Sequence, residues 1–68
     1  MEDGIAELQE RLLKVAEVAA KLSISRALAY RLIRDGLIAS VRIGHAVRVK
    51  PSDLEAYVRR CHRANPGD

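Results

Sequence analysis

The chain has 68 residues and a formal net charge of +3, with 12 Lys or Arg against nine Asp or Glu. This length allows one domain with a thin core, and the core must be aliphatic because the chain contains two Tyr but no Phe or Trp. The single cysteine excludes an intramolecular disulfide and indicates a reducing compartment. No run approaches the roughly 20 apolar residues of a membrane-spanning helix and no signal peptide is seen, so we expect a soluble cytoplasmic protein without a membrane partner.

The positive charge is concentrated in the middle of the chain. Residues 1–17 carry five acidic and two basic side chains (net −3), residues 18–52 carry one acidic and seven basic (net +6), and residues 53–68 carry three of each. A basic block inside an ordered domain is typical of a protein that binds a polyanion. A solvated Arg-rich surface is the alternative, and charge alone does not decide between them.

The hydrophobic pattern predicts two short helices joined by a three-residue turn. The first runs from Val15 to Leu22 with its aliphatic side chains on one arc. Ser25 can cap the second helix, which runs from Arg26 to about Asp35 before Gly36 ends it. One half of this second helix is aliphatic, and the other half carries Arg26, Ala27, Tyr30, Arg31 and Arg34.

The next stretch predicts a two-stranded hairpin, residues 41–43 paired with residues 46–49 around a Gly44-His45 turn, because β-branched and basic residues alternate there. Two strands alone are marginal in water, so the hairpin must lie against the helices. If alternate residues share one face, the basic side chains line one side together and the β-branched side chains turn inward. The basic set is Arg42, Arg48 and Lys50, and the inward set is Val41, Ile43, Val47 and Val49.

A third helix is predicted from Asp53 to about His62, with Ser52 as its N-cap after Pro51 ends the strand. The apolar arc of this helix consists of Leu54, Tyr57, Val58 and Cys61. We therefore expect Tyr57 to belong to the core and Cys61 to be buried. Although Cys61 is followed by a histidine, no second pair of ligands exists elsewhere in the sequence, so no zinc site is predicted.

These elements have the spacing of a helix-turn-helix, in which the second helix enters the major groove of DNA. Arginine suits such a helix because its guanidinium bonds a guanine edge bidentately and also clamps phosphates. We expect the recognition helix to contact DNA through Ser25, Arg26, Ala27, Tyr30, Arg31 and Arg34. We expect the hairpin, as a wing, to contribute Arg42, His45, Arg48 and Lys50. The alternative is that the three basic residues only keep the strands soluble and that His45 is simply a turn residue.

Nothing in the sequence predicts catalysis. A nucleophile with its base and acid, a phosphate-binding glycine loop and a carboxylate pair are all missing from it. We therefore expect a protein that is not an enzyme, with no catalytic residues, no metal site and no cofactor.

The predicted organisation is an N-terminal extension over residues 1–11, a winged helix-turn-helix DNA-binding domain over residues 12–63 and a flexible tail over residues 64–68. The fold class is mostly α with a small β-hairpin, as three helices and a two-stranded wing.

The N-terminal extension has a pattern of its own. Ile5, Leu8 and Leu12 recur at helical spacing, which suggests a short helix over residues 4–12. Two placements are open for this extension, since it can pack on its own domain or contact a neighbouring copy. The net charge of −3 over residues 1–17 favours a head-to-tail contact with the +6 middle of the next copy.

Several motifs resemble those of the excisionase-type DNA-binding domains. Residues 12–19 (LLKVAEVA) resemble the opening LLTVEEVA of these domains, and residues 25–26 with 30–37 are similar to their recognition helix SRRTVYRLIREGKL. Residues 41–44 and 47–49 resemble the wing VRIGRRWRI, and residues 53–57 the closing EDLEAWL. The resemblance covers about residues 12–60 and implies a winged-helix fold related to the DNA-binding heads of MerR regulators.

The chain departs from that family at several positions. Ala27 and Leu28 replace polar residues of the recognition helix, and His45-Ala46 replaces a pair of arginines at the tip of the wing. Ser23 stands where the turn usually has glycine. The resemblance therefore implies the mode of binding but not the DNA target.

The resemblance implies an excisionase, or recombination directionality factor, which binds and bends attachment-site DNA and directs an integrase towards excision of a phage or mobile element. Its expected partners are double-stranded DNA, an integrase and other copies of itself on adjacent sites, at the nucleoid of a bacterium or phage-infected host. A small transcriptional regulator of a mobile element with the same DNA-binding module is the alternative. A ligand-sensing MerR-type regulator is disfavoured, because 68 residues leave no space for a dimerisation helix and an effector site.

Overall fold

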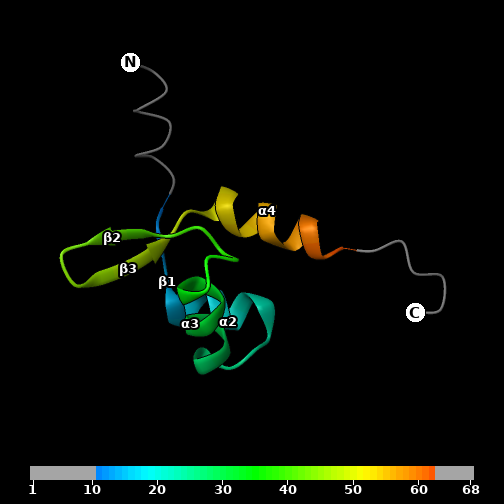
Figure 1. Cartoon of the computed structure of the whole chain (residues 1–68), viewed down its shortest axis with the longest axis horizontal. Coiled ribbons are helices and arrows are strands. Elements are labelled where there is room, and N and C mark those ends of the chain that lie inside the picture. Colours follow the sequence, from blue (N-terminus) through cyan, green and yellow to red (C-terminus); the bar gives the residue numbers. More distant parts are fainter. Residues whose placement is uncertain (1–10, 63–68) are drawn as a thin grey trace, which may run out of the picture.

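A computed structural model describes residues 11–62 and shows three helices with one small sheet (Figure 1). The elements in chain order are β1 (Leu13–Lys14), α2 (Val15–Leu22), α3 (Arg26–Arg34), β2 (Val41–Ile43), β3 (Ala46–Val49) and α4 (Pro51–Cys61). The strands form an antiparallel sheet in the order β1-β3-β2. This winged helix-turn-helix confirms the predicted fold class, with β1 as an additional strand.

The predicted N-terminal helix over residues 4–12 is wrong at its C-terminal end. Residues 11 and 12 have no regular secondary structure, because the chain is already extended where Leu13 pairs with Val49 in the sheet. The other residues of that predicted helix lie outside the described residues.

The helix-turn-helix forms where it was predicted. The backbone N–H of Ser23 donates to Ala20 O at 3.2 Å, and Ser23 has a φ of 59°, so α2 ends in a left-handed residue. The Oγ of Ser25 accepts the backbone N–H of Leu28 at 3.1 Å, which confirms Ser25 as the N-cap of α3. The C-terminal end of α3 leads into Gly36, whose φ of +80° favours glycine.

The hydrophobic core lies between α2, α3, the sheet and α4. Ile38 belongs to this core although it lies in the loop after α3, and only 1% of it is exposed. The backbone N–H groups of Leu37 and Ile38 both donate to Leu32 O, at 2.9 and 3.3 Å. The buried set is Leu13, Val15, Val18, Ala19, Ala29, Ile38, Val49 and Leu54, with Leu32, Ile33 and Tyr57 packed against it as partly buried residues.

The pairing of the wing corrects the predicted arrangement of its side chains. Arg42 lies opposite Val47, and Arg48 lies opposite Val41. Opposite residues in an antiparallel pair point to the same face, so Arg42 and Arg48 lie on different faces and the prediction that they line one side together is wrong. The reason is the two-residue turn between Ile43 and Ala46, which pairs odd positions with even ones.

The predicted inward orientation of all four β-branched residues of the wing is wrong for the same reason. Val47 and Val49 share the face that packs on the core, whereas Ile43 lies on the other face and is 56% exposed. The hairpin is therefore covered on one face only.

The last helix, α4, begins two residues earlier than predicted. Lys50 is its N-cap in place of Ser52, because Pro51 takes the first helical position, where a missing N–H costs nothing. Cys61 is exposed and Val58 is 45% exposed, so the expected burial of Cys61 is wrong. Only the arc at Leu54 and Tyr57 reaches the core.

None of the helices described between residues 11 and 62 combines the length and the apolar character needed to cross a membrane.

Candidate nucleic-acid interface

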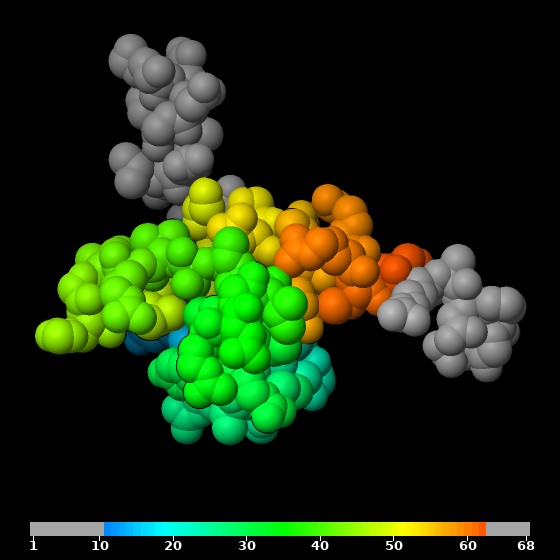
Figure 2. Space-filling model, viewed as in Figure 1, coloured from blue at the N-terminus to red at the C-terminus, as the bar shows by residue number. Residues whose placement is uncertain are grey.

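The recognition helix α3 presents its polar half to solvent, as its helical wheel predicted. Ala29 is completely buried and Leu32 and Ile33 pack on the core, which turns the opposite side of α3 outward. Figure 2 shows α3 and the loop that follows it (green) standing out between the wing (yellow-green) and α4 (orange). The exposed residues of this half are Arg26, Ala27, Tyr30, Arg31 and Arg34.

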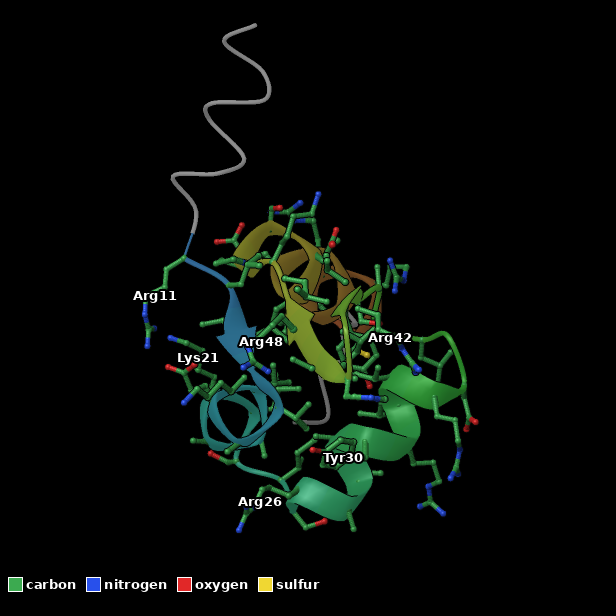
Figure 3. The ribbon with its side chains drawn as sticks, turned by 90° about the vertical axis from the view of Figure 1, so that its left-hand side faces the viewer. Arg11, Lys21, Arg26, Tyr30, Arg42 and Arg48 are labelled. Atoms are coloured by element: carbon green, nitrogen blue, oxygen red, sulfur yellow. The ribbon has the colours of Figure 1, made fainter. Side chains whose placement is uncertain are left out.

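The polar groups at the two ends of α3 make interactions within the protein and can still bind a ligand. The Ser25 hydroxyl accepts a backbone N–H of its own helix, and its O–H remains a donor. Arg34 Nε lies 3.7 Å from Asp35 Oδ1, but both side chains are more than half exposed, so this ion pair is weak. Figure 3 shows Arg26 at the start of α3, pointing away from the wing.

A small groove of about 260 Å³ lies between α3 and the wing. Figure 3 shows Arg42 and Tyr30 on this side of the molecule. Ser40, in the loop before β2, is a further polar residue of the groove that the sequence reasoning missed, since nothing in its neighbourhood marks it. The groove is lined by Tyr30, Ile33, Arg34, Ser40, Arg42 and Val47.

The other predicted wing residues lie elsewhere. Arg48 is half-buried on the opposite face of the sheet, across from Lys14, and its Nη1 donates to Val47 O at 2.9 Å. Figure 3 shows Arg48 beside β1 and α2, away from Arg42. His45 is exposed in the turn at the tip of the wing, and the half-buried Lys50 caps α4. Only Arg42 of this set shares a groove with α3.

The electrostatics of this surface are simple. Arg26, Arg31, Arg34 and Arg42 bring four guanidinium groups to this surface, and each can donate several hydrogen bonds. Asp35 is the acidic residue beside them. Within residues 11–62, no three His, Cys, Asp or Glu side chains come together in a way that would hold a metal ion. The arrangement is suited to binding an extended polyanion.

Comparisons with known proteins agree with this geometry. A family model described as a helix-turn-helix domain matches residues 12–62. Two proteins of Mycobacterium tuberculosis are each 43% identical to the chain over 49 residues. They are named "Putative DNA-binding protein MT0521" (strain CDC 1551 / Oshkosh) and "Putative DNA-binding protein Rv0500A" (strain ATCC 25618 / H37Rv). The match covers 68% of this chain and 63% of each relative, which is less than two thirds of their length. No solved structure matches the chain significantly.

Proposed function

The chain belongs to a family of helix-turn-helix domains, and we propose that it binds double-stranded DNA with α3 in the major groove. The observation that carries this proposal is the exposed polar half of α3, opposite the half that packs on the core. A major groove about 12 Å wide admits one helix with its side chains. The proposed role is binding and not catalysis.

Each group of the interface has a proposed task. Arg31 lies on the exposed half of α3, between Arg26 and Arg34 along the helix, and is assigned to a base edge because arginine bonds guanine bidentately. Arg34 and Arg42 face a common groove between α3 and the wing, which suits a backbone phosphate. Arg26 and the Ser25 hydroxyl at the start of α3 suit a second phosphate, because helix N-termini favour anions.

The biological role that we propose is that of an excisionase, which binds and bends attachment-site DNA and directs an integrase towards excision. It is supported by the motifs of residues 12–60 that resemble excisionase-type domains. Further copies of the chain on adjacent sites and an integrase are the proposed partners, at the nucleoid. A transcriptional regulator of a mobile element would use the same contacts on DNA, so this second role differs in the partner and not in the interface.

The DNA-binding proposal is tested with two double variants of equal charge. DNA ligands are first selected from a random pool by the unaltered protein, and affinity is then measured by mobility shift. Arg31→Ala with Arg34→Ala removes one base contact and one phosphate contact, and we expect a loss of about 1–3 kcal/mol for the base contact alone. Arg59→Ala with Arg63→Ala removes the same charge near the C-terminus and should change affinity little. Equal losses in the two variants would contradict the assignment of α3.

The excision role is tested in a reconstituted recombination reaction. The protein is added to the integrase of a phage or mobile element and to DNA that carries the joined attachment sites of that element. We expect excision to rise and the DNA to be bent, as measured by gel mobility of circularly permuted fragments. If the protein binds and represses a promoter of the element but leaves excision unchanged, the regulatory role replaces the excisionase role.

A further inference from the structure

A second and larger groove, of about 660 Å³, lies between α2, β1 and α4 and contains no residue of α3. Its apolar surface comes from Leu13, Leu22, Leu54 and Val58. Val58 is 45% exposed, whereas Leu54, one helical turn earlier, is only 6% exposed. The groove thus leaves aliphatic surface in contact with water beside the core.

The rim of this groove is basic. Arg11, Lys21 and Arg59 line it, with Glu55 as the acidic residue among its lining. Arg59 Nη2 lies 3.9 Å from Glu55 Oε1, and both side chains are more than three-quarters exposed, so this pair is weak. Arg11 Nη1 lies 3.0 Å from Glu17 Oε2 at the edge where β1 begins. An occupant of the groove should therefore be apolar on one side and acidic.

Residues 1–10 of the same chain have this character. They contain Glu2, Asp3, Glu7 and Glu10 and no basic side chain, which gives a side-chain charge of −4. Ile5 and Leu8 are three positions apart, so they share one face of any helical turn. The segment also continues directly from Arg11, which itself lines the groove.

We propose that residues 1–10 bind in this groove of their own chain, with Ile5 and Leu8 against Leu22 and Val58. The reach is sufficient. The six steps from Ile5 to Arg11 span about 9 Å in a helix and up to about 20 Å when extended, and the seven helical steps from Pro51 to Val58 along the groove span about 10 Å. The acidic side chains are then placed near Lys21 and Arg59, where opposite charges attract.

The tether favours the segment of the same chain over that of a second copy. A segment joined without a linker has an effective concentration of about a millimolar or more at the groove. A segment from another copy must first lose its translational and rotational freedom. This inference does not depend on DNA binding, because no residue of α3 takes part.

A double-mutant cycle on the full chain tests the contact. We expect Ile5→Ser with Leu8→Ser to lower the Tm by about 5–10 °C, since about 1 kcal/mol shifts a domain of this size by 4–8 °C. Val58→Ser should lower the Tm in the unaltered chain but hardly at all in the Ile5/Leu8 variant, because both changes remove one contact. Ala6→Ser is the control within the same segment. An unchanged Tm in the Ile5/Leu8 variant, or strict additivity with Val58→Ser, would overturn the proposal.

A distance measurement distinguishes the two possible occupants. Cys61 is exposed, is the only cysteine and precedes His62 of the groove lining, so a nitroxide can be attached there alone. We expect it to broaden the amide NMR signals of residues 5–8, and the broadening to fall in the Ile5/Leu8 variant. In a mixture of spin-labelled chains with unlabelled isotope-enriched chains, no broadening should appear. Broadening in that mixture would show that a second copy fills the groove and would overturn the proposal.

Discussion

Arg42 and Arg48 carry the same charge on neighbouring strands of the wing but lie on opposite faces of the sheet. Arg42 lines the groove beside α3, whereas Arg48 donates to a carbonyl of its own strand. We expect Arg42→Ala to weaken binding to all DNA sequences alike. The slope of log affinity against log salt concentration should fall by about one, as for the loss of one phosphate contact. Arg48→Ala removes the same charge and is the matched control. Anisotropy titrations over a series of salt concentrations compare the two variants. A larger effect of Arg48→Ala would show that DNA contacts the face of the wing that carries Arg48, and would contradict the prediction.

Glu17 stabilises the start of α2 through its negative charge. The Lys14 backbone N–H donates to Glu17 Oε1 at 2.9 Å and Arg11 Nη1 lies 3.0 Å from Oε2, and these two partners hold the pKa of Glu17 below its ordinary value of 4.5. A lowered folded-state pKa means that the stabilisation is present above the unfolded-state pKa and is lost as the pH falls through the folded-state pKa.

Replacing this carboxylate with an amide therefore tests the charge itself. In Glu17→Gln the side-chain oxygen can still accept the Lys14 N–H, but the group no longer titrates. We expect the unaltered protein to have the higher Tm at neutral pH, and the difference to shrink as the pH falls below 4.5. Calorimetric melts over this pH range measure it. A Tm difference that does not change with pH would show that the charge contributes nothing.

At the level of elements, the turn between α2 and α3 holds a local strain. Ser23 is the only non-glycine residue with positive φ within residues 11–62, at 59°. A side chain with a Cβ costs about 1–2 kcal/mol in this left-handed conformation. Glycine avoids this steric cost, but it loses about 0.5–1 kcal/mol more backbone entropy on folding. We expect Ser23→Gly to stabilise the domain by up to about 1 kcal/mol, and Ser23→Ala, which keeps the Cβ, to give no such gain. Urea unfolding measures both, and equal midpoints for the two variants would exclude backbone strain.

The helices and the two strands of the wing were predictable because each carries a local signal. Ser25 caps α3, the aliphatic arc of α3 repeats at helical spacing, and Gly44 marks the turn of the hairpin. The register of the wing was also contained in the sequence, since a turn of two residues always pairs odd positions with even ones. The strand β1 had no such signal. It consists of two residues whose partners, Arg48 and Val49, lie far along the chain.

The exposed half of α3 was predictable from its wheel, but the rest of the candidate site depends on contacts between distant residues. Ser40 enters the groove only because the loop after α3 folds back towards the wing. Arg60 donates from Nη2 to Leu37 O at 2.6 Å across 23 positions of sequence. No periodicity reveals such a contact.

In the domain as a whole, the loop after α3 fixes the recognition helix relative to the wing. Ile38 anchors this loop in the core, the Leu32 carbonyl accepts two of its N–H groups, and Arg60 holds the Leu37 carbonyl from α4. The two halves of the proposed interface are therefore held together before DNA arrives, and little ordering is left to be done on binding.

The proposed interface is small. Its size leads to a prediction about how the affinity for DNA depends on the binding of neighbouring copies of the protein. One recognition helix with one wing resembles the single modules that bury about 600–1,000 Å² on DNA. We expect one copy to bind weakly, and binding to strengthen when copies occupy adjacent sites, because a copy that bends the DNA prepares the neighbouring site. If residues 1–10 lie in the groove of their own chain, as proposed above, they cannot link neighbouring copies. The coupling between copies must then come from the DNA or from other surfaces of the protein.

The prediction is measured as affinity per site on DNA carrying one, two or three copies of the selected sequence. We expect affinity per site to rise with the number of sites, while the free protein sediments as a monomer. The variant Ile5→Ser with Leu8→Ser should keep this rise, because the extension lies in the groove of its own chain and not between neighbours. Loss of the rise in that variant would assign the coupling to a head-to-tail contact of the extension. Equal affinity per site on all three DNAs, or a stable dimer in free solution, would contradict the prediction itself.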